Sequence, residues 1–311
     1  CSLIRLDHLQ YFEMNASPFK RIIAVTVILL VVAVLLYRNS KQQVPPSISD
    51  INAFFDAVFE RQIAQSPIRQ SSLGRKTDQL DQWDDFSDEF TAQQIEETRN
   101  DLMRLKSDFD YEALSTDEQL SYDLFVFNAE RAINNFKFYR HHYVVDQFNG
   151  QLSRLITVLQ NNHPVESKQD AEDYISRIEG LEQVLLEMAG QLRDRAEFGV
   201  MAPAFSFSDV ITDARSISSG VPIDDTARDN AVYIDFSNKI SKLDTNPANK
   251  EELLSRAVAA LRGPFSDGFA VLIDKIERQR PLVDGDRGVW SLPDGDAFYR
   301  NRIYHHTTLT L

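Results

Sequence analysis

Residues 167–198, SKQDAEDYISRIEGLEQVLLEMAGQLRDRAEF, decide the fold class of this chain. Apolar side chains recur in this stretch every three or four positions, which places them on one face of an α-helix. They are Tyr174, Ile178, Leu181, Leu185, Met188 and Leu192. Ser167 is suited to cap the start, and Gly199 and Pro203 follow the end. The sequence therefore predicts one long amphipathic helix.

The same period recurs on both sides of this stretch. It predicts helices over residues 51–63, 91–105, 115–133, 151–161, 208–218, 233–243 and 246–279. Gly263-Pro264 should kink or split the last of these, because proline removes a hydrogen bond inside a helix. Residues 66–88 have no clean period and are expected to be a loop, and only residues 139–145 show a strand-like period. We expect an all-α, multi-helix body preceded by one N-terminal transmembrane helix.

An uncharged apolar run begins at Ile22 and ends at Tyr37, directly after Lys20-Arg21. Its sixteen residues would form a helix of about 24 Å, and the flanking residues can supply the rest of the ~30 Å needed to cross a bilayer. A signal peptide would need a small-x-small cleavage site after the run, and the sequence there is a poor one. We expect an uncleaved signal anchor; a cleaved signal peptide and a buried core helix are the alternatives.

The position of this run sets the expected domain organisation. Residues 1–19 are a short cytoplasmic N-terminus, or upstream read-through if translation starts at Met14. Residues 20–38 are the membrane anchor, 39–48 a linker, and 49–311 a helical domain. We expect a single-pass inner-membrane protein whose body faces the periplasm or the cell exterior. The only cysteine is Cys1, so the chain can form no internal disulfide and no cysteine-based zinc site.

The charge of the body argues against one class of partner. The chain has 33 basic and 47 acidic residues. The first 41 residues hold five of the basic and two of the acidic residues. The body therefore has 28 basic and 45 acidic residues and a net charge of −17. A body this acidic repels phosphate backbones, so no nucleic-acid partner is expected.

Catalytic motifs are missing from the sequence. The six histidines form no His-x-x-x-His spacing and no His-Glu-x-x-His motif. The sequence also lacks a Gly-x-Ser-x-Gly elbow and a phosphate-binding loop. His141-His142 is expected to be polar and half-buried or exposed, and Asp84-Asp85 and Asp224-Asp225 to cap helices or face solvent. We therefore predict no catalytic, metal-binding or cofactor-binding residue in this chain.

Several short stretches resemble, in order, the N-terminal portion of a known bacterial family. They are NAFFDAVFER at 52–61, LG at 73–74, WDD at 83–85, QLSYDLF at 119–125, QFNG at 147–150, AEDYISR at 171–177, GVMAP at 199–203, GVWSLP at 288–293, GDAFY at 295–299 and HHTT at 305–308. Each stretch alone is weak, but together they resemble the domain of unknown function 885 (DUF885) over about residues 50–311.

This resemblance implies more than the residues alone do. Full-length members are zinc-peptidase-like, often lipoproteins, and carry a later His-Glu segment that would bind zinc and supply the general base. That segment is absent here, so the resemblance implies the non-catalytic, N-terminal part of a peptidase-like protein that is inactive alone. Zinc is then expected only in a full-length relative. Tyr299, His305 and His306 would line a peptide cleft there. A membrane-anchored interaction or scaffold module is the alternative function.

Overall fold

A computed structural model describes residues 50–283, 285 and 287–309 of the chain. The described residues all belong to one compact unit. The apolar run from Ile22 to Tyr37 lies outside the described residues. Of the helices that the described residues form, none is long and apolar enough to cross a membrane.

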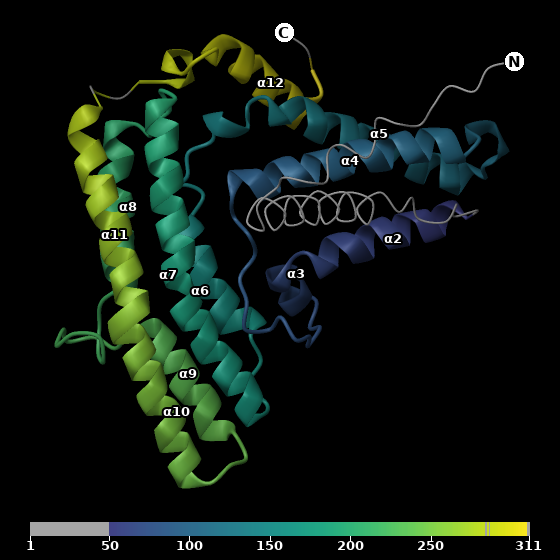
Figure 1. Ribbon diagram of the computed structural model, residues 1–311. Helices are drawn as coiled ribbons and strands as arrows, with labels where there is room; N and C mark the ends of the chain where they lie inside the picture. The colour runs from purple at the N-terminus through teal and green to yellow at the C-terminus, as the bar shows by residue number, and fades with distance from the viewer. Residues whose placement is uncertain (1–49, 284, 286, 310–311) are drawn as a thin grey trace, which may run out of the picture. The chain divides into compact units, whose positions relative to one another are not determined.

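The described part of the chain is helical, and its only β pairing is an isolated bridge between Val221 and Asp229. This confirms the expectation of an all-α body. The helices, labelled as in Figure 1, are α2 (Ile51–Ala64), α3 (Pro67–Ser72), α4 (Asp88–Asp108), α5 (Thr116–Phe136), α6 (Gln151–Asn162), α7 (Lys168–Glu197), α8 (Ala204–Ile217), α9 (Ala231–Lys242), α10 (Pro247–Ala260), α11 (Ser266–Gln279) and α12 (Gly295–Thr307). Short 3-10 turns connect some of them, including η2 (Tyr139–His141).

The long helix α7 is the centre of the core. Its start is closed by a capping box in which Ser167 Oγ accepts from the Asp170 amide and the Asp170 carboxylate accepts from the Ser167 amide. Its apolar face is buried against α11, which runs beside it in Figure 1, and against α6 and α10. All six apolar residues predicted for this face are buried.

The predicted break at Gly263-Pro264 is confirmed. Helix α10 ends at Ala260, a π-helical turn (η3, Leu261–Phe265) follows, and α11 begins at Ser266. Gly263 has non-helical backbone angles, φ −97° and ψ −109°. Because the residue before a proline is restricted away from the helical region, the kink falls on this glycine. It lets α10 and α11 both keep contact with α7.

Several predictions of local structure are wrong, and α8 begins at Ala204, four residues before the predicted start at residue 208. Residues 66–88 contain the short helix α3, which Ser66 caps and in which Pro67 takes the first position, where its missing N–H costs nothing. Helix α4 is capped by Ser87, four residues before Thr91, where the sequence predicted its start. The strand-like stretch from residue 139 begins with the 3-10 turn η2, since its bulky alternating side chains pack around that turn and not onto a sheet.

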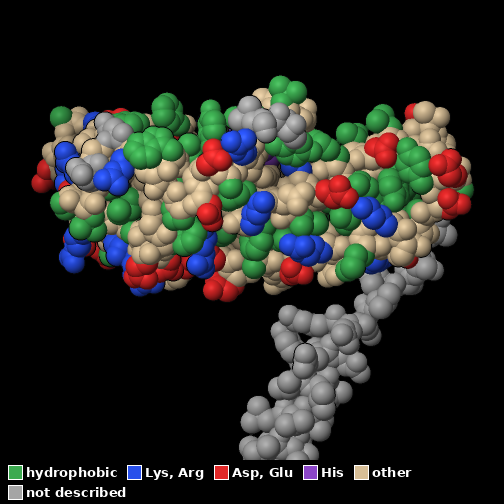
Figure 2. Space-filling model, turned by 90° about the horizontal axis from the view of Figure 1, so that it is seen from above, with side chains coloured by type: hydrophobic (Ala, Val, Ile, Leu, Met, Phe, Trp, Pro, Cys, Tyr) green, Lys and Arg blue, Asp and Glu red, His purple; other side chains and the backbone are tan. Residues whose placement is uncertain are grey.

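Helix α12 packs on a second, smaller apolar cluster. Phe138, Val200, Leu292 and Phe298 form it, and each is less than a tenth exposed. This cluster joins the segment after α5, the segment after α7 and the C-terminal helix. Figure 2 looks onto the upper face of Figure 1 and shows acidic, basic and hydrophobic side chains interspersed there. The acidic excess is therefore not gathered into one patch on this face.

Candidate functional site

A groove of about 500 Å³ lies beside α6 and α7, where the segments before α4 and after α5 cross them. This volume is within the range of small-molecule and peptide-side-chain sites. The groove is lined by Ile68, Phe86, Thr91, Tyr139, His142, Tyr143, Val144, Gln151, Arg154, Leu155, Val158, Val184, Met188, Gln191 and Arg195. These residues come from six separate parts of the sequence, so the groove is a product of the tertiary fold.

Apolar side chains of α6 and α7 form the floor of the groove. Leu155 and Val158 are three residues apart on α6, and Val184 and Met188 are four apart on α7. Such spacings place each pair on one face of its helix. All four side chains are buried. The floor is therefore rigid and suited to an apolar group.

One wall of the groove is held by an ion pair between α7 and α4. The guanidinium of Arg195 donates to both carboxylate oxygens of Asp88, each at 2.8 Å. The Arg195 side chain is only 5% exposed, so this pair is largely screened from water. Hydrogen bonding to Arg195 holds the pKa of Asp88 below its ordinary value. Bidentate geometry of this kind fixes orientation as well as charge.

Tyr139 extends this wall. Its hydroxyl donates to Asp88 Oδ1 at 3.0 Å and accepts from Thr91 Oγ1 at 3.3 Å. The Arg195 guanidinium lies over its ring, 4.9 Å from the centroid. Burial raises the pKa of Tyr139, so the hydroxyl stays protonated. The hydroxyls and the carboxylate of this wall are thus bonded to one another and to the two terminal nitrogens of Arg195, whereas Arg195 Nε is buried without a partner among the described residues.

The rim differs from the wall because one of its charges has no partner. Arg154 is exposed at the first turn of α6 and makes no side-chain hydrogen bond or ion pair with the described part of the chain. His142 is also exposed at the rim, and partial burial of its ring, with Arg302 nearby, lowers its pKa. At neutral pH the rim therefore offers one free cation and one neutral imidazole.

A second buried arginine holds the segment that carries Ile68 and Phe86. Arg177 is fully buried on α7 and donates to Gln82 O at 3.0 Å and to Ser71 Oγ at 2.8 Å. The indole N–H of Trp83 in turn donates to Arg177 O at 2.8 Å. These bonds tie residues 66–83 to α7 and so place the end wall of the groove.

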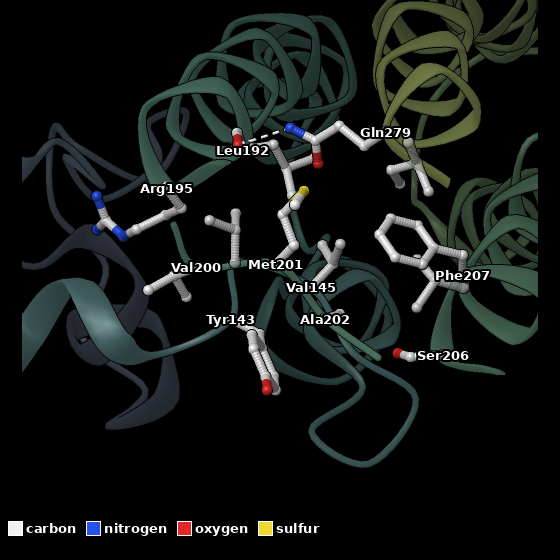
Figure 3. Close-up of a pocket in the computed structure, with 13 residues that line it drawn as sticks. Tyr143, Val145, Leu192, Arg195, Val200, Met201, Ala202, Ser206, Phe207 and Gln279 are labelled. Carbon is white, nitrogen blue, oxygen red and sulfur yellow. Dashed lines mark hydrogen bonds between the residues drawn. The ribbon is translucent and has the colours of Figure 1, made fainter. Parts of the chain in front are cut away.

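Behind the groove lies an enclosed cavity of about 20 Å³ (Figure 3). It shares Tyr143, Val144 and Arg195 with the groove. The Arg195 guanidinium points away from the cavity, while Gln279 at its edge donates to Leu192 O at 2.7 Å. The cavity is the size of one water molecule. It is too small for a substrate, whereas the groove is not.

The residues expected from the resemblance lie elsewhere, on α12. Tyr299 is 50% exposed. His305 Nδ1 lies 2.6 Å from the side-chain nitrogen of Asn135, and His306 Nε2 lies 2.8 Å from an Arg302 nitrogen. None of the three lines the groove. Their role in a cleft of a longer relative stays a prediction.

The two histidines of the middle pair have different surroundings. His141 is 4% exposed, and its Nε2–H donates to Pro293 O at 2.7 Å. Its ring packs against Phe298, with centroids 5.0 Å apart. His141 therefore attaches the segment before α12, whereas its neighbour His142 faces the groove. Nothing in the local sequence distinguishes them, because the contact with residue 293 is a long-range one.

The acidic pairs have structural roles, as expected. Asp84 accepts from Ser66 Oγ at 2.6 Å and from the Ile68 amide at 2.9 Å, at the start of α3. Asp224 accepts from the amides of Gly220 and Thr226. Within the described residues, no group of three or more His, Cys, Asp or Glu side chains is arranged to hold a metal ion.

Comparisons with known proteins give a family and a fold. The model of a family described as bacterial protein of unknown function (DUF885) matches residues 67–311. No curated protein matches the chain. The crystal structure of a presumed lipoprotein from Colwellia psychrerythraea is similar, with 17% sequence identity and a TM-score of 0.70. The match covers 84% of this chain and 46% of that one, so the chain spans about half its length. At this identity the likeness shows the fold alone.

Proposed function

Since the chain belongs to the bacterial family of unknown function DUF885, we propose that its groove holds peptides. In this proposal the chain is the N-terminal, non-catalytic part of a membrane-tethered, zinc-peptidase-like protein. Peptide hydrolysis and zinc binding belong to residues of a full-length relative. The body faces the periplasm or the cell exterior, and the run from Ile22 to Tyr37 attaches it to the inner membrane.

The observation that supports this role is the chemistry of the groove. Its floor is apolar and buried, its wall is held by the pair of Arg195 and Asp88, and its rim is polar. Peptide sites combine such apolar pockets for side chains with polar groups that orient the backbone. The groove volume of about 500 Å³ accommodates two or three residues of a peptide.

Binding and hydrolysis by the full chain test this proposal together. The chain, purified in a mild detergent, is mixed with fluorescently labelled hexapeptides that contain one Phe or Leu. We expect the peptides to bind, measured as a rise in fluorescence anisotropy. Mass spectrometry should show no cleavage, and metal analysis should find less than one zinc per chain. Cleavage that survives a chelator would contradict the non-catalytic role.

A floor variant shows whether the groove is the binding site. Val158→Asn places an amide on the floor, and we expect peptide affinity to fall about tenfold, since burying an unpaired polar group is costly. Val271 lies on α11 and is 43% exposed, so Val271→Asn makes the same chemical change outside the groove. Equal affinities of the two variants would contradict the proposal.

The alternative, an anchored interaction module, is favoured by a different surface. Helix α5 exposes Leu120, Leu124 and Phe127, which are 60%, 53% and 37% exposed and lie at helical spacing. An exposed apolar stripe of this kind marks a protein-binding surface. If this surface is the functional one, Leu124→Ser should abolish capture of a partner protein, and Val158→Asn should leave that capture unchanged.

A further inference from the structure

The charge of the groove contrasts with the charge of the chain around it. Asp and Glu supply 47 of the 311 residues, yet the fifteen residues that line the groove include neither. The lining includes two arginines, Arg154 and Arg195. The groove is therefore a region free of carboxylates in an acidic body.

Only one of these arginines can bind a ligand. Arg195 already donates to both oxygens of Asp88 and is almost fully buried. Arg154 is exposed and forms no ion pair with any described residue. An arginine presents a planar fork of donors that matches a carboxylate. The complementary ligand group is thus an anion at the rim, next to α6.

The floor adds a second requirement, an apolar group close to that anion. Val158 is four residues after Arg154 on the same helix, so the cation and the floor lie side by side, with Cβ atoms about 6 Å apart. The last residue of a peptide carries its side chain and its terminal carboxylate on one Cα. In an extended peptide, by contrast, the side chain next to an internal acid points to the opposite face. A C-terminal residue satisfies both requirements with the fewest ordered atoms.

We propose that the groove recognises the C-terminus of a peptide whose last side chain is large and apolar, with its carboxylate on Arg154. The inference rests on the proposed peptide-holding function and names its ligand class. The apolar side chain packs on Leu155, Val158 and Met188, and the carboxylate accepts two hydrogen bonds from the Arg154 guanidinium. His142 is neutral at the rim and adds no second positive charge, so the cation that the carboxylate meets there is Arg154.

Three labelled hexapeptides test this inference with the full chain in detergent. The first ends in Phe with a free carboxylate, the second is the same peptide with a C-terminal amide, and the third is an amide with Glu before Phe. We expect the free acid to bind about fivefold more tightly than either amide, the size of effect that an exposed ion pair gives. Equal affinity of the acid and the plain amide would overturn the inference. Binding of the Glu peptide as tight as that of the free acid would also overturn it, since the carboxylate would then come from a side chain.

Two variants assign the effect to one residue. Arg154→Gln should remove the preference for the free acid, and Arg154→Lys should keep a part of it. Arg280 is an exposed arginine outside the groove and has no ion pair with the described part of the chain, so Arg280→Gln is the matched control and should keep the full preference. A preference that persists in Arg154→Gln would assign the carboxylate to another residue and overturn the inference.

If no peptide binds at all, the proposed function fails together with this inference. Tight binding without a preference for the free acid contradicts the inference alone.

Discussion

Helix α7 carries two buried arginines whose surroundings differ in one respect. Arg177 and Arg195 are eighteen residues apart, five full turns, and therefore lie on the same side of the helix. Both bind residues that precede or begin α4. Arg195 is neutralised by the carboxylate of Asp88. Among the described residues, no carboxylate lies within hydrogen-bond distance of Arg177, which donates to backbone carbonyls, a hydroxyl and an imidazole.

The pKa values of the two groups reflect this difference. Burial lowers the pKa of Arg177 to about 10, and more distant aspartates only partly oppose the shift. Burial also lowers the pKa of Arg195, but the hydrogen bonds and charge attraction of Asp88, together with Tyr139, outweigh burial and leave the pKa above its ordinary value. Arg177 remains charged at neutral pH. The comparison indicates that Arg177 stabilises the fold, whereas Arg195 shapes the groove.

The largest expected effect follows from removal of the first arginine. Arg177→Ala leaves two carbonyls, a hydroxyl and a buried imidazole without their donor. It also leaves a cavity where the arginine side chain was. We expect a loss of about 4 kcal/mol of unfolding free energy, measured by urea titration. Arg193→Ala is the control on the same helix, because Arg193 is exposed and, among the described residues, its side chain bonds only Asp194; its effect should lie within the error of the titration. Equal losses in the two variants would contradict the role of Arg177.

His163 should make the Arg177 region sensitive to acid. Its Nδ1 accepts from Arg177 at 3.3 Å, its Nε2–H donates to Asp170 O at 2.9 Å, and burial lowers its pKa from 6.5 to about 4. Above pH 6.5 neither the folded nor the unfolded chain protonates this group. Between pH 6.5 and about 4 the unfolded chain takes up a proton that the folded chain excludes, so stability falls as the pH falls.

The full loss from this histidine should be about 3 kcal/mol, by the free energy of the pKa shift. Urea titrations at pH 7.5 and pH 4.5 measure it, with His163→Gln as the comparison. The glutamine variant should lose less stability between these two pH values than the natural chain does. The same loss in both chains would show that His163 is not the responsible group.

A smaller effect is expected at the second arginine. Asp88→Asn leaves Arg195 with a neutral partner, and we expect a loss of about 2 kcal/mol, because the amide oxygen still accepts one hydrogen bond and the Asp88 side chain is 19% exposed. The same substitution at Asp274, which pairs on the surface with Arg278, should cost less than about 0.5 kcal/mol. Asp88→Asn should also weaken peptide binding, since Tyr139 and Arg195 form the groove wall. Unchanged peptide affinity would show that the ion pair does not contribute to peptide binding in the groove.

The smallest expected effect concerns two glycines of α7. A Cβ added at Gly190 meets nothing within 4 Å, so Gly190→Ala should stabilise the chain by about 0.8 kcal/mol through helix propensity. A Cβ added at Gly180 would lie 3.1 Å from Trp83 Cδ1, next to Arg177. Gly180→Ala should therefore stabilise the chain less than Gly190→Ala does, or destabilise it. Thermal unfolding of both variants measures this difference. Equal gains at the two positions would show that Trp83 is loosely held.

The periodic features of the sequence predict most of the helices but not the groove. The buried face of α7, its cap at Ser167 and the break at Gly263-Pro264 each follow from residues close in sequence, and the structure confirms them. The groove depends on contacts such as that of Arg195 with Asp88, 107 residues apart, which have no local signal. Arg177 likewise has the sequence appearance of a surface residue.

The central claim is that the groove beside α6 and α7 holds a peptide. Photo-crosslinking tests it most directly, with a hexapeptide that ends in a photoreactive phenylalanine analogue and the full chain in detergent. Mass spectrometry of the digested product then locates the attachment site. We predict attachment to Leu155, Val158 or Met188, with competition by the unlabelled peptide. Attachment on the exposed face of α5, at Leu120, Leu124 or Phe127, would contradict the claim and favour the interaction module.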